Sequence, residues 1–413
     1  METSGKIELR GWGIVIIGWA AFMLANLSNF AFGIILPDMR QEIGFGLETS
    51  GWLSAVAWIG KGLLTIPISL FITKAKPKRI LQIIFLVLGS GMLLQGFATN
   101  IVMLFVGRLF VMGVAAGILS VLVLFKIQYI PKDKMGFING IETFAGPAGQ
   151  TLGTIAIPFL LAIMTGWRSV MILMGFVGIA LSILWTFVCK DKNENKVEEV
   201  KKEKKSILAP LKEAVSQKNV LLLALGWPGT SLTWIAIYTF WPTYAVETLG
   251  LTLVQAGMVL GFLPVASMIS SLLSPIIAKK IGYDKPIICL SGLVLPISYF
   301  AMLQTSNIPL LCLASFISGY AAYSFVPLAF TVLYKIPNLS SEAVSLGTGF
   351  IFTLVGLGGA LGGSLAGILG STFGLYKAIA LTCLAPFIFF ILTLFLDETG
   401  EKAQMKKAQE VDK

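Results

Sequence analysis

The feature that most constrains this chain is a series of apolar runs, each about 20 residues or longer, that recurs along the whole sequence. A helix of that length crosses a hydrocarbon core roughly 30 Å thick, and only helices and closed barrels satisfy their backbone hydrogen bonds there. The runs lack the strict alternation expected of barrel strands. Charged residues make up only 13% of the chain. The sequence therefore predicts an all-α polytopic membrane protein.

Twelve transmembrane helices are predicted from these runs. They are residues 11–36, 51–73, 80–98, 101–130, 135–165, 167–189, 220–246, 253–278, 286–303, 309–333, 343–369 and 375–396. Lysine and arginine concentrate in the links that follow even-numbered spans, at 74–79, 132–134 and 279–285. By the positive-inside rule, the protein is expected to span the cell inner membrane several times, with both termini on the cytoplasmic side. The net charge of +10 is thus explained by topology and does not indicate nucleic acid binding.

An internal repeat divides the chain into two halves. Each member of the first set has a counterpart about half a chain later: Pro37, Gly44, Gly51, Lys74, Asn100 and Pro131 recur as Pro242, Gly250, Gly257, Lys279, Asn307 and Pro337. Two pseudo-symmetric six-helix bundles are expected, at 1–189 and 219–400. The Lys- and Glu-rich segment 190–218 is expected to be a solvated cytoplasmic linker, and 401–413 a cytoplasmic tail.

The chain resembles the major facilitator superfamily over nearly its whole length. Besides the repeat and the linker, the resemblance rests on Arg108 followed by Gly113 and Gly117 in span four, on the Gly-Pro-Ala-Gly run at 146–149 and on the Gly-Trp-Arg run at 166–168. It implies alternating access by rocking of two bundles around a central cavity lined mainly by spans one, four, seven and ten. It does not imply a substrate.

The chain departs from the superfamily pattern in the cytoplasmic link after span two. That link usually reads Gly-x-x-x-Asp-Arg-x-Gly-Arg, and its acid helps to latch the inner gate. Here the acidic position falls on Lys74, and on Lys279 in the second half. Another group must therefore hold the gate.

Two cations inside predicted spans are the first candidates for substrate binding. Lys61 lies near the middle of span two, where a lysine facing lipid costs about 3 kcal/mol. Arg108 lies at a similar depth in span four and suits bidentate carboxylate or phosphate recognition. Each is weighed against a structural role: pairing with a carboxylate or helix carbonyls for Lys61, and gating or packing for Arg108.

Glu142 is the acid deepest inside a predicted span, and the chain has no histidine to relay a proton. A hairpin between spans four and five brings Glu142 near Lys126. The two readings are a structural ion pair with Lys126 and a proton carrier whose burial favours the protonated form.

Uncharged residues complete the candidate binding set. Asn26 and Asn29 share a face of span one, where an amide in lipid must bond to a neighbour or a ligand. Aromatic side chains recur at helical spacing in spans seven and ten. The cavity candidates among them are Trp234, Tyr238, Tyr320 and Tyr323.

The surplus of embedded cations predicts a secondary carrier for a small organic anion, such as a monocarboxylate. The alternative is proton-coupled efflux of lipophilic compounds, suggested by the 146–149 run and the aromatic residues, with Glu142 as the proton site. A receptor built on a transporter fold is a third reading. The sequence shows no catalytic triad, metal cluster or ATPase domain, so an enzyme is not expected, nor a cofactor. The expected partners are an anionic substrate, lipids and a coupling proton, with the protein a monomer.

Overall fold

The computed structural model describes residues 7–72, 76–189, 208–336, 339–403 and 405. Every regular element in these ranges is a helix. The chain divides into two compact units, Met1–Lys202 and Glu203–Lys413, which are described separately below.

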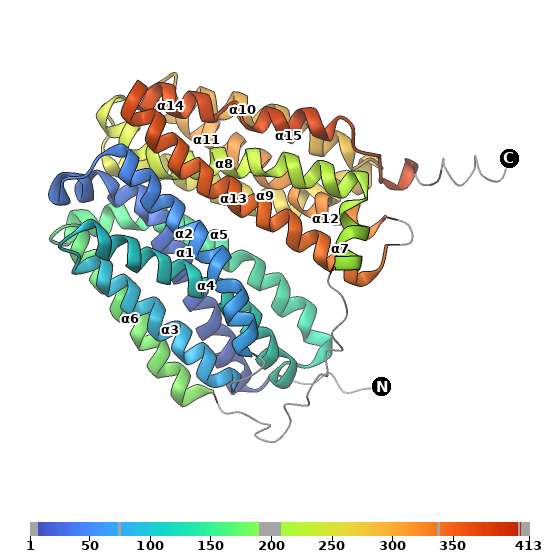
Figure 1. Cartoon of the computed structure of the whole chain (residues 1–413), viewed down its shortest axis with the longest axis horizontal. Helices are drawn as coiled ribbons and strands as arrows, with labels where there is room; N and C mark the ends of the chain where they lie inside the picture. Colours follow the sequence, from blue (N-terminus) through green and yellow to red (C-terminus); the bar gives the residue numbers. More distant parts are fainter. Residues whose placement is uncertain (1–6, 73–75, 190–207, 337–338, 404, 406–413) are drawn as a thin grey trace. The chain divides into compact units, whose positions relative to one another are not determined.

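The first unit contains one helix for each of the first six predicted spans. They are α1 (Leu9–Ile43), α2 (Leu47–Ile72), α3 (Pro77–Gly96), α4 (Ile101–Tyr129), α5 (Lys132–Ile163) and α6 (Trp167–Val188). Within the unit, α1 packs against α5, α2 against α4, and α3 against α6 (Figure 1). Helices that are not adjacent in sequence thus pack against each other in this unit.

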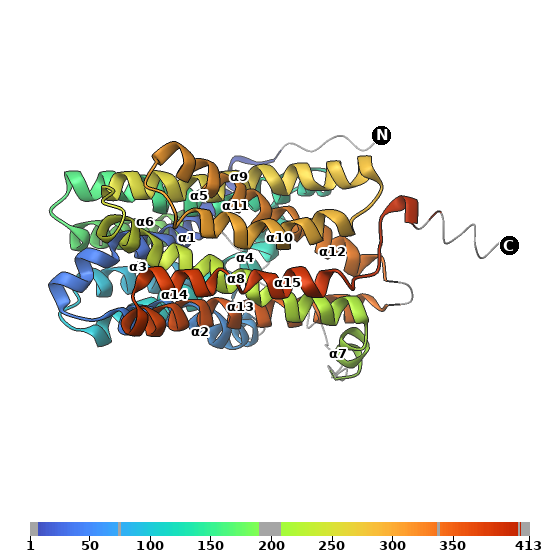
Figure 2. The same ribbon diagram turned by 90° about the horizontal axis from the view of Figure 1, so that it is seen from above.

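The second unit contains the remaining spans and one short extra helix. Its helices are α7 (Leu208–Val215), α8 (Lys218–Glu247), α9 (Leu253–Ile281), α10 (Lys285–Ala301), α11 (Ile308–Ser324), α12 (Val326–Tyr334), α13 (Ser341–Phe373), α14 (Leu375–Thr382) and α15 (Pro386–Thr393). Here α8 packs against α13, and α9 against α11. Helices α14 and α15 follow one another along a common line (Figure 2).

Two predicted spans are interrupted, at residues that the sequence already marks. Span 309–333 is divided into α11 and α12 next to Pro327, and span 375–396 into α14 and α15 before Pro386. Proline lacks an N–H and its ring clashes with the preceding turn, so it ends or kinks a helix.

The predicted linker differs from the structure in its second part. Residues 190–207 lie outside the described residues, but α7 forms within 208–215. Ala214 is fully buried, and Glu213 accepts hydrogen bonds from the backbone N–H and the hydroxyl of Ser340. This part of the segment therefore packs on the second unit and is not simply solvated.

Two of the repeated pairs have the same structural role in both units. Asn100 and Asn307 accept hydrogen bonds from Met103 N and Leu310 N, and so cap α4 and α11. Gly44 and Gly250 both adopt positive φ, of 80° and 70°, just after α1 and α8. The repeat thus specifies where equivalent helices begin and end.

Ten helices in the described part are long and apolar enough to cross a membrane. Together with α2 and the shorter α10, they account for the twelve predicted spans.

Candidate functional site

Arg108 lies inside the first unit, where α1, α2 and α4 meet. Its side chain is 4% exposed. Its Nε donates to Leu53 O of α2 at 2.7 Å, and its Nη2 donates to Asn29 Oδ1 of α1 at 3.3 Å. The ring of Phe32 covers the guanidinium, with 3.7 Å between the ring centroid and Cζ. The structure therefore brings two of the predicted residues, Arg108 and Asn29, into contact.

The neighbours of Arg108 are neutral. No ion pair to Arg108 is present among the described residues; those found involve other cations. A buried charge normally has an opposite charge beside it, because carbonyl oxygens and a ring only partly replace water. The positive charge of Arg108 is therefore not neutralised by a carboxylate of the described residues and is available to attract an anion.

Lys61 occupies a different environment on α2. Its side chain is exposed, and Nζ lies 5.2 Å from the centroid of the Trp58 ring. The neighbouring Gly60 packs directly on α4, since a Cβ there would be 2.6 Å from Leu109 O. Lys61 and Arg108 each adjoin this contact in sequence, so they lie at one level of the α2–α4 pair.

Asn26 does not join Arg108. Its Nδ2 donates to Phe22 O of its own helix at 2.9 Å. A Cβ at Gly149 of α5 would be 2.9 Å from Asn26 Cβ. The two asparagines of α1 therefore have separate surroundings: Asn26 lies against α5, and Asn29 bonds to α4.

Lys126 and Glu142 form a buried ion pair between α4 and α5. Lys126 Nζ lies 2.9 Å from both carboxylate oxygens, and the side chains are 3% and 15% exposed. Nζ also donates to Asn139 Oδ1 at 2.8 Å, and Trp19 Nε1 of α1 donates to Glu142 Oε2 at 3.1 Å. Glu142 is therefore held by two helices as well as by its own.

Three of the four aromatic candidates cluster in the second unit. The Trp234 ring lies 4.9 Å from that of Tyr238 and 5.5 Å from that of Tyr323, measured between centroids. Trp234 and Tyr238 are buried on α8, and Tyr323 is half-buried on α11. Tyr320 is half-buried on α11, and no ring contact to it is found in the described part of the chain.

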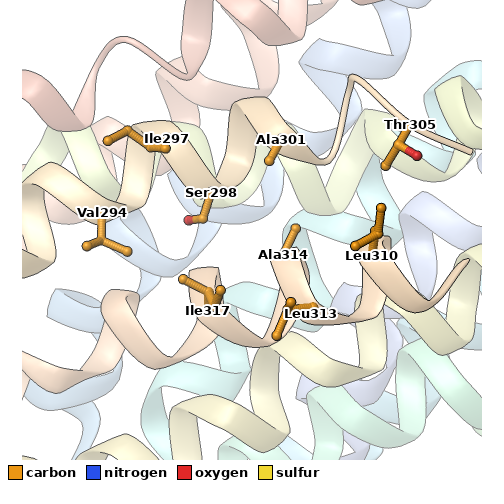
Figure 3. A pocket seen from close by; sticks show the side chains of 9 residues that line it. All are labelled: Val294, Ile297, Ser298, Ala301, Thr305, Leu310, Leu313, Ala314 and Ile317. Atoms are coloured by element: carbon orange, nitrogen blue, oxygen red, sulfur yellow. The ribbon is translucent and has the colours of Figure 1, made fainter. Parts of the chain in front are cut away.

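An apolar cavity of about 380 Å³ lies between α10 and α11 (Figure 3). Its lining residues are Val294, Ile297, Ser298, Ala301, Thr305, Leu310, Leu313, Ala314 and Ile317. The Ser298 hydroxyl donates to Leu295 O and accepts from Ser318, and the Thr305 hydroxyl accepts from Asn307 N. With its hydroxyls occupied and no charged side chain, this cavity is unsuited to an ion.

The C-terminal segment after α15 was not identified from the sequence as functional. Glu398 accepts backbone hydrogen bonds from Asp284 at 2.7 Å, Lys285 at 3.3 Å, Thr399 at 3.0 Å and Gly400 at 2.9 Å. These donors include the N–H groups at the start of α10, where a carboxylate is stabilised by the helix dipole. The only available signal was the acidic Asp-Glu-Thr-Gly run at 397–400.

A second acid completes this cluster. Asp284 is buried; its Oδ2 lies 3.0 Å from Lys335 Nζ and accepts from Thr399 Oγ1 at 2.9 Å. Lys279, at the end of α9, is exposed, and Lys74 lies outside the described residues. Two carboxylates thus hold the link after α9, although the superfamily's acidic position there is a lysine.

The first unit has a charged cluster of its own, where α1 ends and α6 begins. Glu42, at the end of α1, accepts from Trp167 Nε1 and Arg168 Nε, both at 2.6 Å. Arg168 Nη1 also donates to Gly96 O at the end of α3 and to Ala98 O just after it, at 3.2 and 2.5 Å. The 166–168 run therefore joins the ends of α1, α3 and α6.

Comparison with known proteins decides the family. The sequence pattern described as Major Facilitator Superfamily matches residues 18–338. The chain belongs to the major facilitator superfamily. The predicted fold of two six-helix bundles is thereby confirmed, as is the assignment to transporters and not to enzymes.

Relatives within the superfamily include carriers named for small anions. The nitrite extrusion protein of Bacillus subtilis (strain 168) is 27% identical over 81% of this chain and 82% of its own length. A probable nitrate transporter NarT of Staphylococcus epidermidis is 26% identical, covering 79% and 80%. A putative tartrate transporter of Agrobacterium vitis is 22% identical, covering 96% of both chains.

Solved structures of the superfamily share the fold. A bacterial homolog to the human lysosomal transporter Spinster, inward-facing and unoccupied, has a TM-score of 0.81 at 14% identity and covers 94% of this chain and 98% of its own. The nucleoside transporter NupG has a TM-score of 0.76 at 12% identity, covering 94% and 100%.

Proposed function

We propose that this chain is a secondary carrier that moves a small anion across the cell inner membrane by alternating access. The observation that carries the proposal is Arg108, a buried guanidinium with carbonyl and aromatic neighbours but no carboxylate among the described residues. An anionic substrate supplies the missing negative charge. The nitrite, nitrate and tartrate carriers among the relatives support the same class.

Within this class, a small organic anion with one carboxylate is our specific proposal. A carboxylate presents two coplanar oxygens, which match two N–H groups of a guanidinium. Lys61, at the same level of the α2–α4 pair as Arg108, supplies a second positive charge. The second unit, taken by itself, has an aromatic surface formed by Trp234, Tyr238 and Tyr323, which suits uncharged groups of a substrate.

The remaining features of the proposal concern topology and assembly. The lysine-rich links that follow the even-numbered spans support a cytoplasmic location of both termini. The carrier works as a monomer, as expected for a chain that contains both bundles. Glu142 is disfavoured as the site of a coupling proton, because its carboxylate is already paired with Lys126 and accepts a hydrogen bond from Trp19. Lys126 in turn donates to Asn139.

The test measures thermal stabilisation of the purified protein by nitrate, nitrite, acetate, lactate, tartrate, sulfate and the lipophilic cation tetraphenylphosphonium. A ligand at a hundred times its Kd stabilises the folded state by about 2.7 kcal/mol. We expect stabilisation by small anions. In Arg108→Gln, loss of a charge-assisted contact of about 1.5–3 kcal/mol should weaken anion affinity about 10- to 100-fold.

Three further variants sharpen this test. Arg108→Lys keeps the charge without the fork and should bind anions weakly while folding normally. Lys61→Gln should lower anion uptake into proteoliposomes. Lys280→Gln removes an exposed charge at the end of α9 and serves as the matched control. Stabilisation by the lipophilic cation alone, unchanged in Arg108→Gln, would replace the proposal with efflux of lipophilic compounds.

A further inference from the structure

Both hydrogen bonds of the Arg108 side chain lie on one edge of its guanidinium. The group is planar and carries five N–H donors. Nε donates to Leu53 O and Nη2 to Asn29 Oδ1, so two carbonyl oxygens fill the edge that Nε and Nη2 share. The opposite edge, formed by Nη1 and the second N–H of Nη2, has no hydrogen-bond partner among the described residues. That edge is itself a two-donor fork.

Two residues of α1 set the orientation of this fork. Asn29 and Phe32 are three residues apart and therefore lie on one face of the helix. Asn29 fixes the rotation of the guanidinium through Oδ1, and Phe32 fixes the tilt of its plane by stacking 3.7 Å from Cζ. A single turn of α1 thus restrains both rotations of the charged group.

We infer that Asn29 and Phe32 position Arg108 so that its open Nη1–Nη2 edge binds one planar oxyanion, either a carboxylate or a nitrate-like ion. This inference rests on the proposed function. An in-plane fork matches two coplanar oxygens. A tetrahedral anion such as sulfate carries oxygens out of that plane, and the Phe32 ring covers one of the two sides that they would enter. Asn29 and Phe32 are positioning and selectivity residues, and Arg108 is the residue that touches the anion.

The decisive variant is Asn29→Asp. A carboxylate at this position lies beside Nη2 and pairs with Arg108, which removes the positive charge that an anion requires. We expect the ligand-free protein to be at least as thermostable as the wild type, with nitrate- and acetate-induced stabilisation lost. A merely structural Asn29 would give the opposite pattern: altered ligand-free stability with normal anion stabilisation.

Two smaller changes test the orientation itself. Asn29→Ala should weaken nitrate and acetate binding about tenfold, since one orienting hydrogen bond is lost. Phe32→Leu should reduce the preference for nitrate over sulfate, because the ring no longer excludes out-of-plane oxygens. The matched control is Ser28→Ala, at a buried hydroxyl of the same helix that is not a hydrogen-bond partner of Arg108. This control should keep wild-type affinity and selectivity.

The outcomes separate this inference from the proposed function. If no anion stabilises the wild type, the proposed function fails. If anions stabilise the wild type and stabilise Asn29→Asp equally, the positioning role is overturned while the carrier proposal stands. An unchanged nitrate-to-sulfate preference in Phe32→Leu overturns the selection of planar anions.

Discussion

The two units share a fold but bury different chemistry. In the first unit, the buried polar side chains include two cations, Arg108 and Lys126, both inside predicted spans. In the described part of the second unit, the buried polar side chains are mainly serine and threonine hydroxyls, and the buried charge, Asp284, lies just before α10 begins. The first unit therefore buries one cation within α4, Arg108, and one in the last turn of α4, Lys126, whereas the buried charge of the second unit lies at a helix end.

This difference shows which features of a duplicated unit persist. Equivalent helices begin and end at equivalent residues in both halves: Asn100 and Asn307 cap α4 and α11, and Gly44 and Gly250 adopt positive φ after α1 and α8. Interior side chains are less constrained by the backbone, since a helix accepts either a cation or a hydroxyl at a position that packs. The first unit is consequently suited to recognise charge, and the second to provide uncharged contacts.

The largest effect expected from this comparison concerns the Lys126–Glu142 pair. Glu142→Gln leaves Lys126 buried without its carboxylate, and breaking a buried pair in this way costs about 3–5 kcal/mol. Asp284→Asn should cost less, because its partner Lys335 is 27% exposed whereas Lys126 is 3% exposed. Thermal unfolding of both variants in one detergent measures the difference.

A double replacement provides the control for this prediction. Lys126→Met combined with Glu142→Met removes both charges, and such apolar replacements are often neutral or stabilising. Recovery of stability would identify the cost in Glu142→Gln as that of an unpaired cation. Proton-coupled uptake that survives in the double variant would exclude Glu142 as a proton carrier. Equal losses in Glu142→Gln and Asp284→Asn would contradict the contrast between the units.

Hydropathy predicted the spans because lipid requires long apolar helices whatever their packing. The Lys126–Glu142 contact could also be predicted from the sequence, since a short hairpin between α4 and α5 fixes which residues face each other. The contacts of Arg108 could not, because they depend on how α1, α2 and α4 pack together. The breaks beside Pro327 and Pro386 were missed because a span is recognised by length, which a kink does not change.

The role of Glu398 illustrates the limit of sequence patterns further. Its partners Asp284 and Lys285 lie more than a hundred residues earlier, and nothing local indicates the contact. A sequence motif located the link after α9 and showed that its usual acid is absent. The structure shows that Asp284, from the link itself, and Glu398, from the segment after α15, supply the carboxylates at this end of the unit.

A smaller effect is expected when this end of the second unit is altered. Glu398→Gln replaces a carboxylate that accepts several backbone hydrogen bonds with a neutral amide, and we expect a loss of about 1–2 kcal/mol. Glu401→Gln, three residues later at an exposed position, is the matched control and should leave thermal stability unchanged. Equal behaviour of the two variants in thermal unfolding would remove Glu398 from the cluster.

The smallest effect should come from the hydroxyls inside the second unit. Ser318 Oγ donates to Ser298 Oγ at 2.9 Å and to Ala314 O at 2.8 Å, and thereby joins α10 to α11. Interhelical hydrogen bonds in membrane proteins contribute about 0.6 kcal/mol on average, so Ser318→Ala should lower stability only slightly. Ser271→Ala, whose hydroxyl bonds within α9, is the control. If these hydroxyls only join helices, anion-induced stabilisation will be unchanged in Ser318→Ala. A reduced anion response would instead involve the second unit in recognition of the anionic group and remove the division of roles between the units.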